Sequence, residues 1–138
     1  MPMTAKEFMQ QVRHAENELK LIEKKRRHFQ ELATSISVNL TGMPSGGQQG
    51  ASRVETGAIG IVDLMAGLEQ KAREYTALIV QAEQMLEKIP QDNFRKVLTL
   101  RYMLGYSWKT ILDEMEYKDE KSVYRCHGYA LKELQKFM

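Results

Sequence analysis

The sequence predicts an all-α protein, in which a long antiparallel helical hairpin resembling a coiled coil precedes a C-terminal three-helix unit with a helix-turn-helix. Three observations lead to this prediction. Two long runs place apolar residues alternately three and four positions apart. Glycine and proline gather in a few places between those runs and after them. The last third of the chain has the helix and turn lengths of a helix-turn-helix.

The first run begins at Phe8 and the second at Ile61. Their members are Phe8, Val12, Ala15, Leu19, Ile22, Phe29, Ala33 and Ile36, with Arg26 as the only charged position, and Ile61, Met65, Leu68, Ala72, Tyr75, Ile79, Ala82, Leu86 and Ile89. Spacing of this kind, sustained over several heptads, favours two helices that pack along a common seam.

The two helices are predicted to be antiparallel. Each seam is about 42 Å long at about 1.5 Å per residue. A flexible segment as long as residues 37–60 spans only about 25–30 Å, so it cannot run back along a whole helix. We therefore expect residues 1–89 to form a hairpin with a flexible, glycine-rich connection near residues 37–56. The hairpin would serve in oligomerisation or in docking a partner.

Residues 90–138 are predicted to hold three helices. Apolar residues at Phe94, Val97, Leu98 and Tyr102 follow one helix face, which ends at Gly105 as a C-cap glycine would end it. Ser107 is a predicted N-cap for the short helix "WKTILDEM". Asp119 is a predicted N-cap for a longer helix over residues 119–137, with Val123, Cys126 or His127, Ala130, Leu131, Leu134 and Phe137 turned inward.

The outward face of that last helix is the candidate site. In a helix-turn-helix the second helix presents the exposed residues of its N-terminal half to the major groove of DNA. Here the candidate DNA-binding residues are Glu120, Lys121, Ser122, Tyr124, Arg125 and Lys132. Arginine can bind guanine through two hydrogen bonds, and lysine, serine and tyrosine can contact phosphates. We expect no packing role for Lys121, Ser122, Tyr124 and Arg125.

Other residues of this region are interpreted as structural. We expect Trp108 to anchor the core and Cys126 to be a small buried hydrophobic residue. His127 is expected to be structural, with a hydrogen bond to the backbone. Gly128 is expected to allow a close approach to another element or to DNA.

Composition argues against several classes of protein. The single cysteine rules out an internal disulfide, and no histidine or cysteine spacing suggests a metal, so no cofactor is expected. No nucleophile and base are grouped together, and an enzyme is not expected. No apolar stretch is long enough for a membrane span, and we expect a cytoplasmic protein. The net charge of +2 is small, so a DNA-binding protein of this kind would gain affinity from dimerisation.

The segment "VLTLRYMLGYSWKTILDEM" with "SVYRCHGYALKEL" resembles region 4 of bacterial sigma factors. With "LTGMPSGG" and "GAIGIVDL", the chain resembles more closely the sigma-region-4-like regulators of phages and prophages of Gram-positive bacteria, such as the ArpU-type and RinA-type regulators and related uncharacterised phage families. The resemblance covers residues 40–134. It departs from the pattern at "EMEYKDEKSV", where the turn is one residue longer and Glu120 replaces a basic residue.

This resemblance implies a phage protein that binds double-stranded DNA and regulates transcription, with host RNA polymerase as a further partner. Two alternatives stay open. One is a phage DNA-packaging component similar to a small terminase subunit. The other is a protein-protein adaptor whose helix-turn-helix does not bind DNA.

Overall fold

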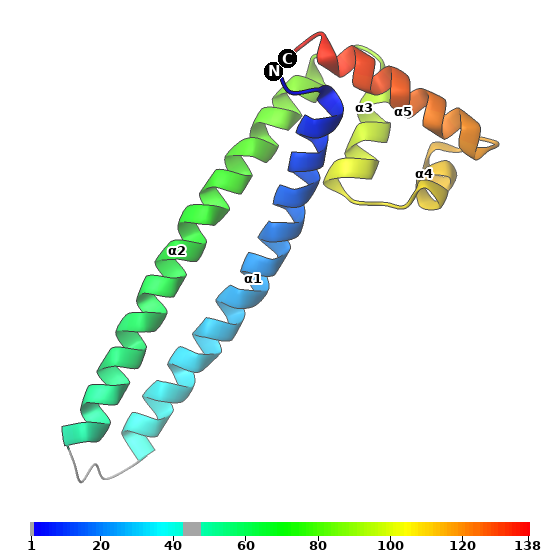
Figure 1. The fold of residues 1–138 in the computed structure, drawn as a ribbon. Coiled ribbons are helices and arrows are strands. Elements are labelled where there is room, and N and C mark those ends of the chain that lie inside the picture. Colours follow the sequence, from blue (N-terminus) through cyan, green and yellow to red (C-terminus); the bar gives the residue numbers. More distant parts are fainter. Residues whose placement is uncertain (1, 43–47) are drawn as a thin grey trace. The chain divides into compact units, whose positions relative to one another are not determined.

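The computed structural model describes residues 2–42 and 48–138, and the side chains of residues 2–36 and 57–138. Every regular element in these ranges is a helix, which confirms the all-α prediction. In chain order the elements are α1 (Ala5–Gly42), α2 (Gln48–Glu87), α3 (Asp92–Leu98), the π-helical segment η1 (Thr99–Met103), α4 (Trp108–Met115) and α5 (Glu120–Gln135) (Figure 1). None of the helices described is both long enough and apolar enough to cross a membrane.

Helices α1 and α2 pack together along the predicted seam, as antiparallel neighbours. Among residues 19–74, Arg26 of α1 lies beside Glu69 of α2, and Ile36 of α1 lies beside Gly57 of α2. Residue numbers rise along α1 where they fall along α2, so the two helices are antiparallel. Arg26 was the charged exception in the apolar run. Its guanidinium binds the Glu69 carboxylate at 2.6 Å and the Glu23 carboxylate at 2.9 Å, so the exception forms an ion-pair bridge within the hairpin.

The connection predicted near residues 37–56 is helical at both of its ends. The backbone of α1 continues through Gly42, and α2 begins at Gln48. The prediction of a flexible segment over the whole range is therefore wrong for residues 37–42 and 48–56, while residues 43–47 lie outside those the structure describes. The glycines at the start of α2 lie within the helix, although a glycine in a helix interior costs about 1 kcal/mol relative to alanine.

The chain forms two compact units, one of residues 1–18 with 75–138 and the other of residues 19–74. The sequence predicted a division into residues 1–89 and 90–138, which differs from these two units. The reason is that the first turns of α1 and the last turns of α2 share a core with the three C-terminal helices. That core consists of Ala5, Phe8, Met9, Val12, Ala82, Leu86, Ile89, Val97, Leu98, Leu100, Tyr102, Met103, Ile111, Val123, Cys126, Ala130 and Leu134. Every element of this unit contributes to it.

The start of α1 is fixed by two sets of hydrogen bonds. Thr4 and Glu7 form a reciprocal capping box, with Glu7 N–H donating to Thr4 Oγ1 at 3.1 Å and Thr4 N–H donating to Glu7 Oε2 at 3.4 Å. The next N–H, that of Ala5, donates to Gln135 Oε1 in the last turn of α5 at 2.8 Å. The unpaired donors that any helix start exposes are thus satisfied partly by α5.

The helix that begins with α3 widens before it ends. In η1 the N–H of Leu104 donates to the carbonyl of Thr99, a π-type bond of 3.0 Å, and the N–H of Tyr106 donates to the carbonyl of Leu100 at 2.9 Å. Gly105 follows with φ of +73°, which confirms it as the glycine that ends the helix. The space that a Cβ at Gly105 would fill is occupied by the guanidinium of Arg13.

Gly128, in contrast, has open space where its Cβ would stand, and it is exposed on α5. The expectation that it allows a close approach to another element is therefore wrong within the described residues.

These two glycines give a matched pair of substitutions. Gly105→Ala places a Cβ in the left-handed region, which costs about 1–2 kcal/mol, and it also displaces Arg13. Gly128→Ala fills open space in a helix interior and is expected to raise the free energy of unfolding by about 0.5–1 kcal/mol. Urea unfolding followed by circular dichroism measures both. Equal effects of the two substitutions would contradict this account of Gly105.

Candidate nucleic-acid interface

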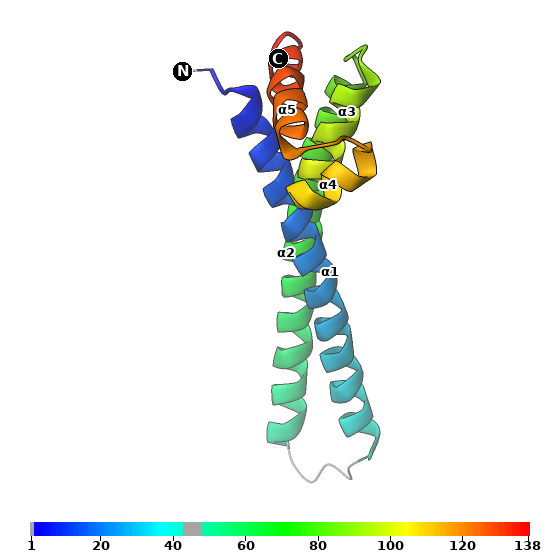
Figure 2. The ribbon, with the colours of Figure 1, turned by 90° about the vertical axis from the view of Figure 1, so that its right-hand side faces the viewer.

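Helix α4 begins where the sequence predicts it. The Ser107 side chain accepts a hydrogen bond from the N–H of Thr110 at 3.2 Å, which confirms Ser107 as the N-cap. Ile111 is fully buried and Trp108 is half-buried. The helix presents its apolar face to α3 and α5, which hold it in place (Figure 2).

The turn between α4 and α5 is closed by a residue in the left-handed conformation. Glu116 has φ of +57°, and its N–H donates to the carbonyl of Asp113 at 3.2 Å. The N–H of Tyr117 donates to the carbonyl of Leu112, also at 3.2 Å. This pattern ends α4 in the way that a C-terminal glycine motif would, although the residue is a glutamate.

Asp119 starts α5. Its carboxylate Oδ1 accepts from the N–H and from the hydroxyl of Ser122, both at 2.9 Å, and these bonds hold the pKa of the Asp119 carboxyl below its ordinary value. The prediction of an N-cap at Asp119 is confirmed. Residue Ser122, predicted to face DNA freely, has its hydroxyl engaged in this cap.

The inward face of α5 is also as predicted. Val123, Cys126, Ala130 and Leu134 are buried, and Leu131 and Phe137 are half-buried against the same core. The thiol of Cys126 donates to the carbonyl of Asn93 at 3.7 Å, and burial raises the pKa of the thiol. Cys126 is thus the small buried residue that the sequence predicts.

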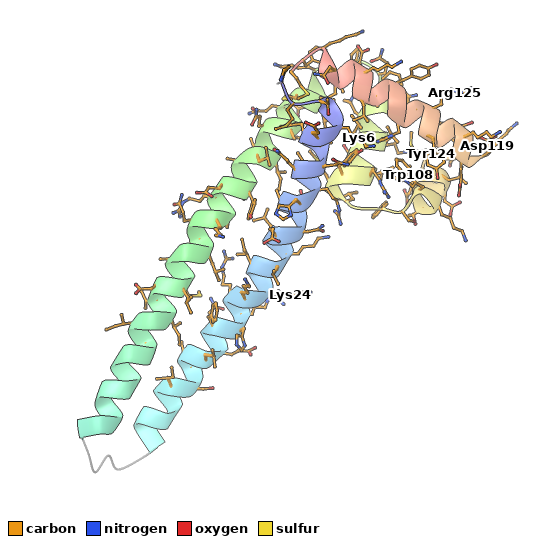
Figure 3. All side chains as sticks on the ribbon, in the orientation of Figure 1. Lys6, Lys24, Trp108, Asp119, Tyr124 and Arg125 are labelled. Atoms are coloured by element: carbon orange, nitrogen blue, oxygen red, sulfur yellow. The ribbon has the colours of Figure 1, made fainter. Side chains whose placement is uncertain are left out.

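The outward face carries most of the candidate DNA-binding residues. Among the exposed ones are Glu120, Lys121, Arg125 and Lys132. Figure 3 labels Asp119 at the start of α5, with Tyr124 and Arg125 further along the helix. Lys132 Nζ lies 5.9 Å from the ring centroid of Tyr129, itself exposed. This face therefore presents two lysines and an arginine with one acid at its N-terminal end.

Tyr124 has a packing role that the sequence did not reveal. Its ring meets the edge of Trp108 with the centroids 5.1 Å apart, and its hydroxyl donates to Glu120 Oε2 at 3.5 Å. The expectation that Ser122 and Tyr124 have no structural role is therefore wrong. Both side chains help to set the position of α5 against the turn and α4.

Trp108 belongs to a larger group of aromatic and basic side chains. Its ring also meets that of His127, with centroids 4.8 Å apart, and the guanidinium carbon of Arg101 lies 4.3 Å from its ring centroid. His127 Nε2 is 2.8 Å from the hydroxyl of Tyr102, so this histidine pairs with a side chain and not with the expected backbone group. The spacing of apolar residues could not predict that Arg101 contacts this group, because Arg101 is not part of the apolar pattern of its helix.

Burial and the nearby cations Lys6 and Arg101 lower the pKa of His127 to about 4. His127 is thus neutral in the folded protein at neutral pH. Its neutral ring can both donate and accept, which suits the contact with Tyr102.

Searches for similar proteins return no match to a family model, a curated protein or a solved structure.

The depressed pKa of His127 predicts an acid-dependent loss of stability. Between about pH 6.5 and about pH 4 the unfolded chain binds a proton at His127 that the folded protein does not bind, so stability falls as the pH is lowered through this range. His127→Gln keeps a hydrogen-bonding group for Tyr102 and removes that proton. We expect the variant to lose less stability than the parent over the same range, measured by urea unfolding at several pH values. His28→Gln, at an exposed position, is the control, and the same pH slope in all three proteins would contradict the assignment.

Proposed function

We propose that the protein is a phage-encoded, DNA-binding transcriptional regulator in which α5 enters the major groove of double-stranded DNA. The observation that carries this proposal is the exposed face of α5 directly after a capped helix-turn-helix turn. Lys121 and Arg125 stand on that face and make no ion pair among the residues described. The resemblance to sigma-region-4-like regulators supports the same function.

The candidate DNA-binding residues fall into two groups: those that orient α5 and those that are free to contact DNA. Ser122 and Tyr124 are held by Asp119 and Trp108, so they orient the helix. Lys121 and Arg125 remain available for base edges or phosphates in the first turns, and Lys132 lies two turns further on, where backbone phosphate is the expected contact. Glu120 can accept from the amino group of cytosine, although its charge opposes phosphate.

The start of α5 adds little attraction for phosphate. The N-terminus of an α-helix carries a partial positive charge and favours a nearby phosphate. The Asp119 cap offsets part of that charge at α5. A protein with net charge +2 therefore depends on its few exposed cations for attraction to DNA.

Removing one of these cations tests the proposal. We expect Arg125→Ala to weaken binding to a mixed-sequence DNA duplex and to reduce the slope of log affinity against log salt by about 1, since one phosphate or base contact is lost. Lys121→Ala should act in the same direction. Fluorescence anisotropy over a salt series measures both effects.

Lys24→Ala removes the same charge from α1 in the other unit and serves as the control. Binding that is absent, or that falls equally in all three variants, would contradict the proposal. Absence of binding by the folded parent protein would favour the adaptor alternative. A folded Arg125→Ala protein with unchanged affinity would contradict the role proposed for Arg125.

We also propose that the hairpin joins two copies of the chain. Ile59, Val62 and Leu64 of α2 are 63%, 65% and 53% exposed, and residues 57–68 contain Asp63 as their only charged residue. Ile59 and Val62 are three positions apart, so they share a helix face. Asp63, four positions from Ile59, is the one charged residue beside this face, so two copies could meet there with only one carboxylate on each chain opposing the contact. A weakly basic DNA-binding protein gains affinity when two copies bind together.

A charge on this face should separate the copies. We expect Val62→Glu to weaken self-association at least about tenfold, because an unpaired carboxylate would be buried in the contact. Val80→Glu changes another exposed valine of α2, one that lies outside residues 57–68, and it should leave association unchanged. Light scattering over a concentration series measures both. A monomer at all concentrations would contradict the dimer, and ring-sized oligomers would favour the DNA-packaging alternative.

A further inference from the structure

A pocket lies within the unit of residues 1–18 and 75–138, where residues of the helix-turn-helix meet the start of α1. It has a volume of about 490 Å³ and is lined chiefly by Lys6 and Arg13 of α1, Arg101 and Tyr102 of η1, Trp108 of α4 and His127 of α5. Lys6 and Trp108 are labelled in Figure 3 on two of the contributing helices. Four elements thus surround a space that the DNA-binding proposal does not use.

The charges around this pocket all have one sign. Lys6, Arg13 and Arg101 are cations, and no carboxylate lines the pocket. Within the described ranges, none of the three forms an ion pair with an acidic side chain. Cations placed close together without counter-charges repel one another, so an anion that enters relieves this repulsion.

One of these cations also has an unused donor. Arg13 Nη1 is buried and has no hydrogen-bond partner. A buried donor without a partner costs free energy, and a charged one costs more. The guanidinium occupies the space beside Gly105, where the Cβ of any larger residue would collide with it. The absence of a side chain at Gly105 therefore makes this position of Arg13 possible.

Arg101 is held in place without an acid as well. Its guanidinium lies over the Trp108 ring, and its Nη1 donates to the carbonyl of Tyr106 at 3.0 Å. A cation–π contact and one carbonyl orient the group but leave its positive charge uncompensated. The pocket is therefore pre-organised, with two planar guanidinium groups and a lysine at its walls.

We propose that this pocket binds the phosphate group of a small phosphate monoester. A phosphate monoester carries about 1.5 to 2 negative charges near pH 7 and three acceptor oxygens, which matches a site with three cations. Arginine forks fit the phosphate geometry through paired hydrogen bonds. The wall formed by Trp108 and Tyr102 gives an apolar surface for the remainder of the molecule.

The site would communicate with α5 through Trp108. Its ring contacts His127 at the pocket and Tyr124 on the outward side of α5. Binding of the anion would hold Arg101 and Trp108 in this arrangement. Ligand binding itself does not depend on DNA binding, so failure of one proposal leaves the other standing.

Trp108 is the only tryptophan of the chain, so its fluorescence reports on the pocket directly. The protein is titrated with inorganic phosphate and with glycerol phosphate, at constant ionic strength maintained with chloride. We expect a saturable change in emission. Lys6→Gln and Arg101→Gln should each weaken binding about tenfold or more, since each removes a charged hydrogen bond.

Lys24→Gln removes a cation from the other unit and is the matched control. Circular dichroism verifies folding, and Lys6→Gln alters an exposed side chain, so at least one variant is expected to fold normally. A linear change with phosphate, or equal weakening in Lys6→Gln and Lys24→Gln, would show a general salt effect and overturn the proposal.

A second measurement separates a free phosphate from the DNA backbone. Histidine resonances followed by NMR should show that glycerol phosphate raises the pKa of His127, because an anion in the pocket offsets the effect of Lys6 and Arg101 on this histidine. Arg13 and Tyr102 line the same pocket. An unchanged pKa would overturn the proposal. If a DNA duplex alters Trp108 emission while neither phosphate does, the pocket serves the DNA backbone and the proposal is wrong.

Discussion

The helix-turn-helix of this protein depends on the burial of the first turns of α1 in its core. Phe8, Met9 and Val12 are buried against apolar residues of α3, η1, α4 and α5. Units of about 50 residues rarely bury enough apolar surface to be firmly stable alone. Here the first and last turns of the long helices supply the missing surface. The hydrogen bond from the Ala5 N–H to Gln135 closes the same contact at the end of α5.

A consequence of this packing is an unusual electrostatic environment. Once α1 lies against the helix-turn-helix, Lys6 and Arg13 stand beside Arg101, although the three residues are far apart in the sequence. The π-helical segment turns Arg101 and Tyr102 toward this region, and Gly105 leaves room for the Arg13 guanidinium. His127 responds with a pKa that is lowered to about 4. One tertiary contact thereby explains the glycine, the neutral histidine and the gathered cations.

Local contacts at the start of α5 determine which side chains of its outward face remain free. Asp119 caps the helix with the backbone and hydroxyl of Ser122, and Trp108 supports Tyr124. These contacts fix the helix start and leave Lys121 and Arg125 as its exposed cations in the first turns. A small number of cations on a rigid helix favours orientation over tight binding, so a second copy of the chain would add most of the affinity.

The sequence by itself determined the local features of the fold. The heptad pattern predicted both long helices, and the short reach of the segment between them predicted their antiparallel pairing. Ser107, Asp119 and Gly105 marked helix ends, because caps depend on neighbours within a few residues. The sequence predicted too long a flexible connection near residues 37–56, where the glycines suggested a break although α1 continues through Gly42 and α2 begins at Gln48. It also could not assign roles to Ser122 and Tyr124, since an outward position in a pattern does not reveal a lateral contact with Trp108.

Only the tertiary structure decided which distant residues meet. The core shared by α1 and α5 and the approach of Arg13 to Gly105 join segments from opposite parts of the chain, and the pairing of Tyr102 with His127 joins η1 to α5. Periodicity specifies which face of a helix is apolar but not which helix covers it. For that reason the exposed face of α5 was predictable, and the basic pocket beside it was not.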